Sequence, residues 1–256
     1  MTLKFASVNH QLRNVEWVVN ERKNFIEQIT SSTKEEFNRI IWVDEHGFKL
    51  WTVRHQARSQ RGTPAAVTVP TIKGKNISCI LGVSIAFGKI AFSVCYKDMY
   101  PNIVKVSENT TNSVIFEEFL NLLLNNWKEN QNVPNHIKNK GPIILHDNWN
   151  VHNCVSNFPG ISHIWMPHYS PFLNVAEFIN RDHKLGIRKL FRYFKSFPRY
   201  LEDIKWGEKG RTTISHAKKC AFMAWNDLPE SFIKKHWDHI KETYFEKCLL
   251  LQEINC

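Results

Sequence analysis

The sequence predicts an α/β domain with a mixed sheet, and two kinds of segment in the 256-residue chain support this fold class. Short apolar runs at 40–43 and 143–145 are each followed closely by acidic or polar residues, as is typical of strands buried on both faces of a sheet. Elsewhere, at 116–127 and 171–195, apolar residues recur at helical spacing. Buried strands that alternate with amphipathic helices indicate a layered α/β architecture.

Composition sets the size of the core and the class of partner. With 43% hydrophobic residues, the chain can form one domain with a real core, or a domain plus a small appendage. The formal net charge of +10 favours a polyanionic partner such as nucleic acid, although a merely soluble basic protein can carry the same charge. The sequence shows no secretory signal and no apolar run of membrane-spanning length, so we expect neither secretion nor a membrane partner.

The first part of the chain is predicted to form one helix and three strands. Apolar residues between 17 and 26 suit an amphipathic helix that leads into the strand at 40–44. Residues 77–85 and 90–96 are predicted as two more strands, joined by a hairpin turn at Phe87-Gly88. With the first strand, they would make the antiparallel part of the sheet.

A long basic stretch overlaps these strands. From His46 to Lys97 the sequence contains no acidic residue. Solvated surfaces usually mix both signs of charge, so we predict that a loop at about 52–75 lies on DNA phosphates. Its candidate contacts are Arg54, Arg58, Arg61, Lys73 and Lys75.

The rest of the chain supplies the remaining layers. A packed helix of about 15 residues is predicted around 116–127, followed by the central strand at 143–145 and an edge strand at 162–166 that Pro167 stops. Helical patterns around 211–226 and 229–247 predict a small α-helical tail docked on the sheet. No internal repeat or low-complexity tract occurs.

The predicted helix at 171–195 carries a row of cations. Together with Arg192 and Lys195, the cations Arg181, Lys184 and Arg188 share an arc of roughly 80° with Glu177, at ~100° per residue. An ordinary solvated helix face also carries cations, but it usually places acids four positions away as partners, and Asp182 lies off this arc. We therefore predict that Arg181, Lys184 and Arg188 contact DNA phosphates.

Three acids stand at the ends of the predicted strands or at the start of this helix: Asp44, Asp147 and Glu177. Each alone has an ordinary explanation as a cap or a first-turn helix acid. Together they favour a divalent metal site, because Mg²⁺ prefers carboxylate oxygens and ligands bind at the carboxyl ends of strands in open α/β sheets. Asn148 and His152 are predicted to support the ligands through hydrogen bonds.

The segments around these acids resemble, in order, three motifs of the catalytic domain of mariner-superfamily DDE transposases. They are Asp44-Glu45-His46-Gly47-Phe48, Asp147-Asn148-Trp149-Asn150-Val151-His152 and Tyr169-Ser170-Pro171-Phe172-Leu173-Asn174-Val175-Ala176-Glu177. The resemblance covers roughly residues 37–195. It implies a ribonuclease H-like fold, in which helices flank a mixed five-stranded sheet and a small α-helical C-terminal tail follows. It also implies that Asp44, Asp147 and Glu177 are the catalytic acids and hold two Mg²⁺ or Mn²⁺ ions, with no small-molecule cofactor.

The same resemblance implies a domain organisation and a function. A helical lead-in at 1–36, a DDE catalytic domain at 37–197 and the tail at 198–256 are expected, without the N-terminal helix-turn-helix head of the family. The implied activity is cleavage of DNA strands at transposon ends and their transfer to target DNA. Double-stranded DNA and a second copy of the chain are the expected partners. The expected compartment is the nucleus in a eukaryote, and otherwise the cytoplasm or nucleoid.

Two departures from the family pattern keep other functions open. Asp147 and Glu177 are 30 positions apart, a few fewer than is usual, and Val175-Ala176 stands where the family has Pro and an aliphatic residue. The short spacing and the missing head favour a transposase-derived DNA-binding protein without catalysis, whereas the complete set of acids favours activity. A metal-dependent nuclease unrelated to transposition is the third interpretation.

Overall fold

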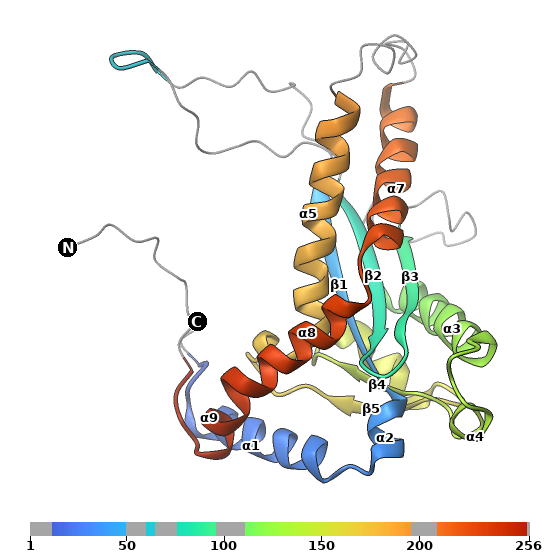
Figure 1. The fold of residues 1–256 in the computed structure, drawn as a ribbon, viewed down its shortest axis with the longest axis vertical. Coiled ribbons are helices and arrows are strands. Elements are labelled where there is room, and N and C mark those ends of the chain that lie inside the picture. Colours follow the sequence, from blue (N-terminus) through green and yellow to red (C-terminus); the bar gives the residue numbers. More distant parts are fainter. Residues whose placement is uncertain (1–11, 50–59, 65–75, 96–110, 196–208, 255–256) are drawn as a thin grey trace.

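A mixed five-stranded sheet lies at the centre of the molecule, as the sequence predicted (Figure 1). The computed structural model describes residues 12–49, 60–64, 76–95, 111–195 and 209–254. The strand order is β3-β2-β1-β4-β5. The strands are β1 (Ile40–Lys49), β2 (Asn76–Ser84), β3 (Gly88–Cys95), β4 (Ile143–His146) and β5 (Ser162–Trp165).

The sheet has an antiparallel half and a parallel half. β1 pairs antiparallel with β2, and β2 with β3, whereas β1 pairs parallel with β4, and β4 with β5. The predicted hairpin between β2 and β3 is confirmed, and Gly88 has a φ of 78° there, a left-handed conformation that glycine adopts without steric cost. The boundaries of the predicted strands shift by only one or two residues, except in β1.

Strand β1 is longer than predicted. The sequence suggested a strand that ends near Asp44, but β1 continues to Lys49 because its antiparallel pairing with β2 extends to Lys49 opposite Asn76. The parallel pairing with β4 stops earlier, at Trp42 opposite Leu145. Asp44 therefore lies inside β1, just beyond the end of its parallel partner.

Helices cover both faces of the sheet and enclose two hydrophobic cores. On one face pack α1 (Glu16–Ser31), α5 (Val175–Lys195), α7 (Lys209–Asp227) and α8 (Ser231–Ile240). On the other face pack α3 (Ser113–Glu129), α4 (Asn135–Lys138) and the 3₁₀ segment η2 (Asn150–Asn157). The lead-in and the C-terminal helices thus share the core of the sheet, and the division of the chain at residues 36 and 197 stays a prediction.

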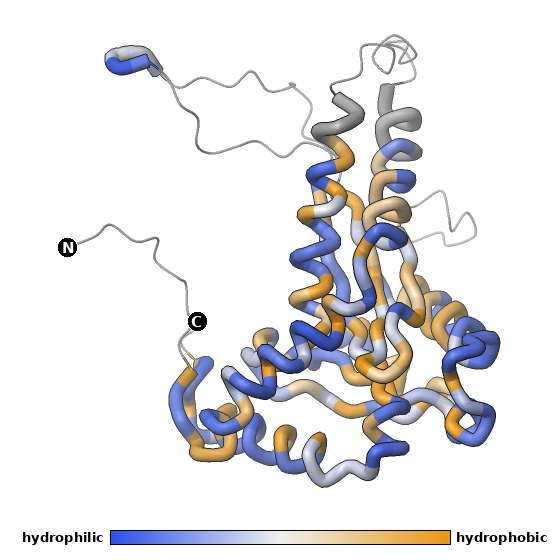
Figure 2. Tube along the Cα trace, viewed as in Figure 1, coloured by the Kyte–Doolittle hydropathy of each residue, from blue (hydrophilic) through white to orange (hydrophobic). Residues whose placement is uncertain are grey.

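Helix α5 runs along β1 and beside α7 (Figure 1). A Cβ at Gly186 would lie 3.1 Å from the Cβ of Ala224, so the glycine permits the close approach of these two helices. In Figure 2, hydrophilic and hydrophobic residues alternate along α5, as expected for a helix with one face on the sheet.

The start of α5 differs from the prediction. We expected one helix from Pro171, but the 3₁₀ turn η3 (Pro171–Leu173) is followed by a break at Asn174. The Oδ1 atom of Asn174 accepts a hydrogen bond from the backbone N–H of Ala176 at 2.9 Å, and such an asparagine bond caps a new helix. Glu177 consequently stands in the first turn of α5.

The remaining elements complete the two ends of the chain. They are α2 (Lys34–Arg39), the π-helical turn η4 (Lys241–Phe245) and α9 (Glu246–Leu249), which packs beside α1 (Figure 1). The helical tail that the sequence predicted is present at 209–249. Across the described ranges, no helix combines the length and the apolar character needed to span a membrane. The five cysteines in these ranges form no disulfide.

Candidate functional site

The register of the parallel strands places the first two predicted acids side by side. Ile40, Ile41 and Trp42 of β1 lie opposite Ile143, Ile144 and Leu145 of β4. If this offset is continued, Asp44 stands across from Asp147. The predicted meeting of acids at the carboxyl end of β4 therefore follows from backbone pairing, before any side-chain contact is considered.

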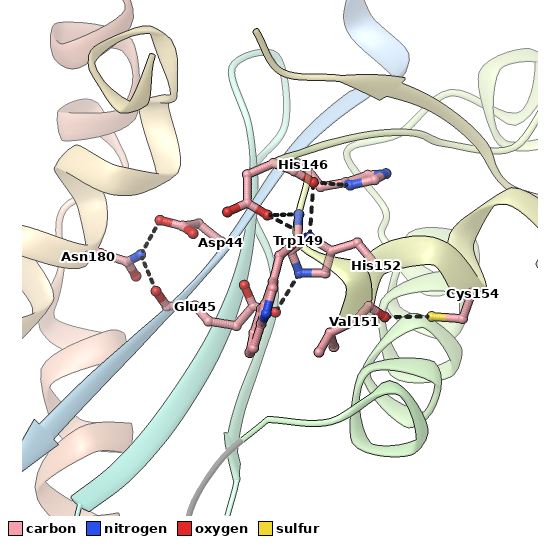
Figure 3. Close-up of polar contacts among 9 residues, drawn as sticks. Asp44, Glu45, His146, Trp149, Val151, His152, Cys154 and Asn180 are labelled. Carbon is pink, nitrogen blue, oxygen red and sulfur yellow. Dashed lines mark hydrogen bonds and ion pairs between the residues drawn. The ribbon is translucent and has the colours of Figure 1, made fainter. Parts of the chain in front are cut away.

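Asp44 points to the face of the sheet that α5 covers, and it is buried with 7% of its surface exposed. The Nδ2 atom of Asn180 in α5 donates a hydrogen bond of 2.8 Å to its Oδ2 atom (Figure 3). The charge of Glu177, one turn before Asn180, acts on Asp44, so the two carboxyl groups lie near each other.

The pKa values of Asp44 and Glu177 are both raised in this environment. Burial, together with the charges of Glu177 and Glu45, raises the pKa of Asp44 well above its usual range. Removal from water also raises the pKa of Glu177, although the nearby Lys184 acts in the opposite direction. Carboxyl groups that resist ionisation because of burial and like charges are the groups that a cation would stabilise.

On the opposite face of β1, His152 connects Asp147 to Glu45, an acid that follows Asp44 in β1. Its Nε2 atom lies 2.8 Å from Oε1 of Glu45 (Figure 3), and its Nδ1 atom lies 2.7 Å from Oδ1 of Asp147. His152 is fully buried, and its ring packs against Phe116 with 4.4 Å between ring centroids. The side chain of Asp147 is 57% exposed, so it faces solvent from this buried support.

The two carboxylates keep His152 charged. Burial alone would lower its pKa, but the hydrogen bonds to Asp147 and Glu45 outweigh burial and raise the pKa to about 10. Burial would likewise raise the pKa of Asp147, yet the hydrogen bond from His152 leaves it below the usual value. Asp147 is therefore ionised and held in place at neutral pH, whereas burial works against ionisation of Asp44 and Glu177.

Other residues of the second motif hold the loop after β4. The side-chain amide of Asn148 donates to the backbone oxygen of Met166 at 2.8 Å, which ties this loop to the end of β5. The backbone N–H of Trp149 donates to Oδ1 of Asp147 at 3.2 Å. His146 is buried, with its Nδ1 atom 2.9 Å from the backbone oxygen of Asp147.

Arg22 of α1 anchors the start of the third motif, a role that the sequence did not predict. It is fully buried, and its Nε atom donates to Oγ of Ser170 at 2.8 Å. Oγ of Ser170 in turn donates to the backbone oxygen of His168 at 2.8 Å. The lead-in helix thereby fixes the turn that precedes Glu177. No pattern in the sequence distinguishes this arginine from the surface cations, because its partner is 148 positions away.

Two further histidines are buried between β1 and α5. His46 of β1 and His183 of α5 form a hydrogen bond of 2.7 Å, and Nε2 of His183 lies 2.9 Å from the backbone oxygen of Ala221. Burial lowers the pKa of His183 to about 4 and holds that of His46 well below its usual range. Both rings are neutral at physiological pH and connect β1, α5 and α7.

The donor set suits a hard divalent cation, although its arrangement is open. Carboxylate oxygens are the ligands that Mg²⁺ prefers, and Oδ1 of Asn180 is a buried acceptor without a hydrogen-bond partner among the described residues. In the same part of the chain, no three His, Cys, Asp or Glu side chains are already grouped closely enough to hold a metal ion. The charge of Glu177 acts on Asp44, while the Asp147 carboxylate lies 2.7 Å from Nδ1 of His152.

The predicted DNA contacts are described only in part. Arg54, Arg58, Lys73 and Lys75 lie outside the described residues, whereas Arg61 is exposed in a turn at 60–64. On α5, Arg188 is exposed and Lys184 is half-buried. The side chain of Arg181 is 60% exposed, and its Nε atom lies 3.6 Å from Oδ1 of Asp182, an exposed pairing of little strength. These α5 cations continue from Glu177 along one helix.

The fold and the site together define the class of protein. It is an α/β domain whose acids Asp44 and Asp147 lie just beyond the last paired residues of β1 and β4. The model of the DDE superfamily endonuclease family matches residues 39–200, and the chain belongs to this family. The matched range contains all three predicted acids. No curated protein matches the chain.

Solved structures of Mos1 transposase have the same fold. The pre-cleavage Mos1 transpososome matches 100% of this chain and 68% of its own, with 18% identity and a TM-score of 0.67. The paired-end complex with the left transposon end has 18% identity and a TM-score of 0.62, and the chain spans 66% of its length. The isolated Mos1 catalytic domain is covered completely, with 97% of this chain matched, 16% identity and a TM-score of 0.58. These matches confirm the predicted ribonuclease H-like fold, which this chain shares with the catalytic domain of Mos1 transposase.

Proposed function

We propose that the chain is the catalytic domain of a DNA transposase that cleaves DNA strands and transfers them with the help of divalent metal ions. The observation that carries this proposal is the proximity of the three acids: Asp44 is buried, and the charges of both Glu177 and Asp147 act on it. Membership of an endonuclease family supports it. So do the Mos1 structures, which are described as complexes with transposon-end DNA, Mg or Mn.

In this proposal, Asp44, Asp147 and Glu177 hold two Mg²⁺ or Mn²⁺ ions. Bound there, the ions would stabilise the attacking and leaving oxygens of a phosphodiester reaction. His152 keeps the Asp147 carboxylate ionised and oriented through its bond of 2.7 Å. Asn180 orients Asp44 through its bond of 2.8 Å and offers its unpaired Oδ1 atom on the same side.

The cations of α5 are proposed to bind the DNA backbone. Arg181, Lys184 and Arg188 continue from Glu177 along the helix, so a strand held by them would run to the acids. Phosphate contacts position DNA but carry no base information, so we expect little sequence preference from this chain alone. The proposed site of action is chromosomal DNA, in the nucleus or nucleoid, and a second copy of the chain is a proposed partner.

One observation favours a second candidate, a transposase-derived DNA-binding protein without catalysis. Within the described ranges the three acids are not grouped as a metal site, and Asp147 is bonded to His152 instead. A domain that keeps the fold and the basic helix but lost its metal geometry would still bind DNA.

Cleavage in the presence of Mn²⁺ separates the two candidates. The folded chain is incubated with a random-sequence duplex and with a duplex that carries the repeats flanking its gene, beside Asp147→Asn as control. We expect slow nicking of both duplexes that requires metal and is lost in the variant. No cleavage of either duplex would favour the non-catalytic candidate. A preference for the repeats above roughly tenfold, about 1.4 kcal/mol, would show that this chain reads bases directly.

Binding of DNA to α5 has its own test. Affinity should fall with salt with a log–log slope near −0.9 per phosphate contact, so replacing Arg181, Lys184 and Arg188 by alanine should flatten the slope by roughly two to three units. The control replaces Lys128, Lys138 and Lys140, which lie in or just after α3 and α4 on the other side of the sheet. A slope that responds equally to both triple variants would show that α5 does not track the DNA.

A further inference from the structure

Two large aromatic side chains are exposed where β4 and β5 end. Trp149, two positions after Asp147, is 44% exposed, and Trp165, the last residue of β5, is 37% exposed. Trp165 is the register partner of His146 at the end of β4. Tryptophan usually buries most of its surface, so exposed rings beside a candidate active site point to a ligand.

Two buried histidines pack against these rings and hold them in place. Trp149 meets His152 edge to face, with 5.8 Å between ring centroids and 83° between planes, and lies beside it in Figure 3. Trp165 meets His146 in the same way at 4.3 Å and 69°. His146 and His152 themselves are in edge-to-face contact at 5.1 Å. The histidines therefore support both tryptophans on the protein side, while the rings stay open to solvent.

The position of Trp149 is coupled to Asp147 by two contacts. Its backbone N–H donates to Oδ1 of Asp147 at 3.2 Å. Its ring rests on His152, whose Nδ1 atom lies 2.7 Å from the same carboxylate oxygen. A group held at Asp147 would consequently lie next to the Trp149 ring, and this adjacency does not depend on the side-chain rotamer of a distant residue.

We propose that Trp149, with Trp165 beyond the histidine pair, is a stacking site for an unpaired nucleobase of the DNA strand whose phosphate lies at Asp147. The proposal rests on the proposed function and names a further part of its substrate. Every base has a π face, so an indole ring can bind any of them without reading the sequence. The site would keep the end of a DNA strand unpaired beside the acids, because a base that stacks on the tryptophan cannot remain paired in the duplex.

Abasic DNA tests this stacking while leaving the phosphates unchanged. The full chain is titrated, with Ca²⁺ present, with a labelled duplex that ends in a short single-stranded thymidine tail, and with the same duplex whose tail is abasic. We expect the tail with bases to bind roughly tenfold more tightly, as stacking of one base on an aromatic ring typically gives. Trp149→Ala should bind both tails equally, and Trp149→Phe should keep most of the preference.

Trp17→Ala is the matched control. Trp17 is 47% exposed, but it lies on α1 against His168 and Tyr169, and we expect its replacement to leave the preference intact. Thermal melting of each variant verifies folding. Equal binding of both tails by the unchanged protein, with the salt dependence retained, would overturn the stacking site and leave the proposed function standing. Preference retained in Trp149→Ala would also overturn it. Failure to bind either duplex would overturn both proposals.

Discussion

His152 and His183 are both fully buried, yet they carry opposite charge states on the two sides of strand β1. His152 lies between two carboxylates, which raise its pKa to about 10. His183 lies between a second histidine and a backbone oxygen, and burial lowers its pKa to about 4. Burial is the same for the two rings, so the hydrogen-bonding partners decide the charge.

This difference follows from the alternation of side chains along β1. Glu45 points to the face that holds η2 and meets His152, whereas Asp44 and His46 point to the face that holds α5. The η2 side therefore neutralises its acids with an internal cation. The α5 side has none among its described hydrogen-bonding partners, and burial raises the pKa of both Asp44 and Glu177 there. We therefore propose that an external cation would act on the α5 side.

Removal of the internal cation should produce the largest effect. His152→Ala leaves Glu45, whose side chain is only 11% exposed, without its partner. Loss of one member of a buried ion pair typically costs 3–5 kcal/mol, and we expect about 3 kcal/mol, because Asp147 can turn to solvent. Urea unfolding at pH 7 measures this loss.

A solvent-exposed pair provides the control for that loss. His168 and Glu21 form a similar contact of 2.9 Å with side chains that are 45% and 38% exposed. Glu21→Ala should cost less than about 1 kcal/mol. Similar losses in the two variants would contradict the view that His152 is a buried counter-ion.

The neutral histidine should give the next largest effect, through pH. The folded pKa of His183 is lowered to about 4, so the unfolded chain binds its proton first as pH falls through about 6.5. Stability is then complete above that pH and is lost toward pH 4. Between pH 7 and 5 the loss from this residue should be about 1–2 kcal/mol.

His183→Asn isolates this contribution, because asparagine can keep a hydrogen bond but does not titrate. His46, which faces His183 from β1, remains in the variant and continues to contribute to the acid sensitivity. Urea unfolding at several pH values should give a shallower decline for the variant than for the unchanged chain. Parallel declines would show that His183 is charged when buried, and would remove the contrast with His152.

Asn180→Ala should have the smallest effect. The amide of Asn180 donates to Oδ2 of Asp44 at 2.8 Å, and removal of one hydrogen bond to a buried acid costs about 1 kcal/mol. Urea unfolding at pH 7 measures it. If the variant were more stable than the unchanged chain, burial of the unpaired Oδ1 atom would cost more free energy than the hydrogen bond to Asp44 contributes.

Much of the fold was predictable because it depends on local pattern. The apolar runs of β1 and β4 and the helical spacing of α3 and α5 are properties of consecutive residues, and their elements are present. The start of α5 was not predicted, because Ser170-Pro171 is a strong signal for a helix start and masks the cap at Asn174. The continuation of β1 past Asp44 was missed because its pairing with β2 is not visible within β1 itself.

The acids of the candidate site stand out in the sequence, whereas the residues that support them do not. Asp44, Asp147 and Glu177 lie near enough for the charges of the other two to act on Asp44, and their role as metal ligands stays a prediction. Arg22 and Asn180 act through partners more than 130 positions away, and a single sequence gives no signal for such pairs. His152 was expected to support the site, but its charge state depends on Glu45. The sequence alone does not show that the Glu45 side chain lies on the same face of β1 as His152.

The most direct test of a cation site on the α5 side is the thermal stability of Asp44→Asn with chelator and with Mg²⁺ or Mn²⁺. Burial and like charges raise the pKa of Asp44, so a neutral isostere should make the metal-free protein more stable, by about 1 kcal/mol. The unchanged chain should gain stability on addition of metal, because the ion binds only the folded state, and the variant should gain almost none. A variant that is less stable with chelator, or that gains as much from metal as the unchanged chain, would contradict the account.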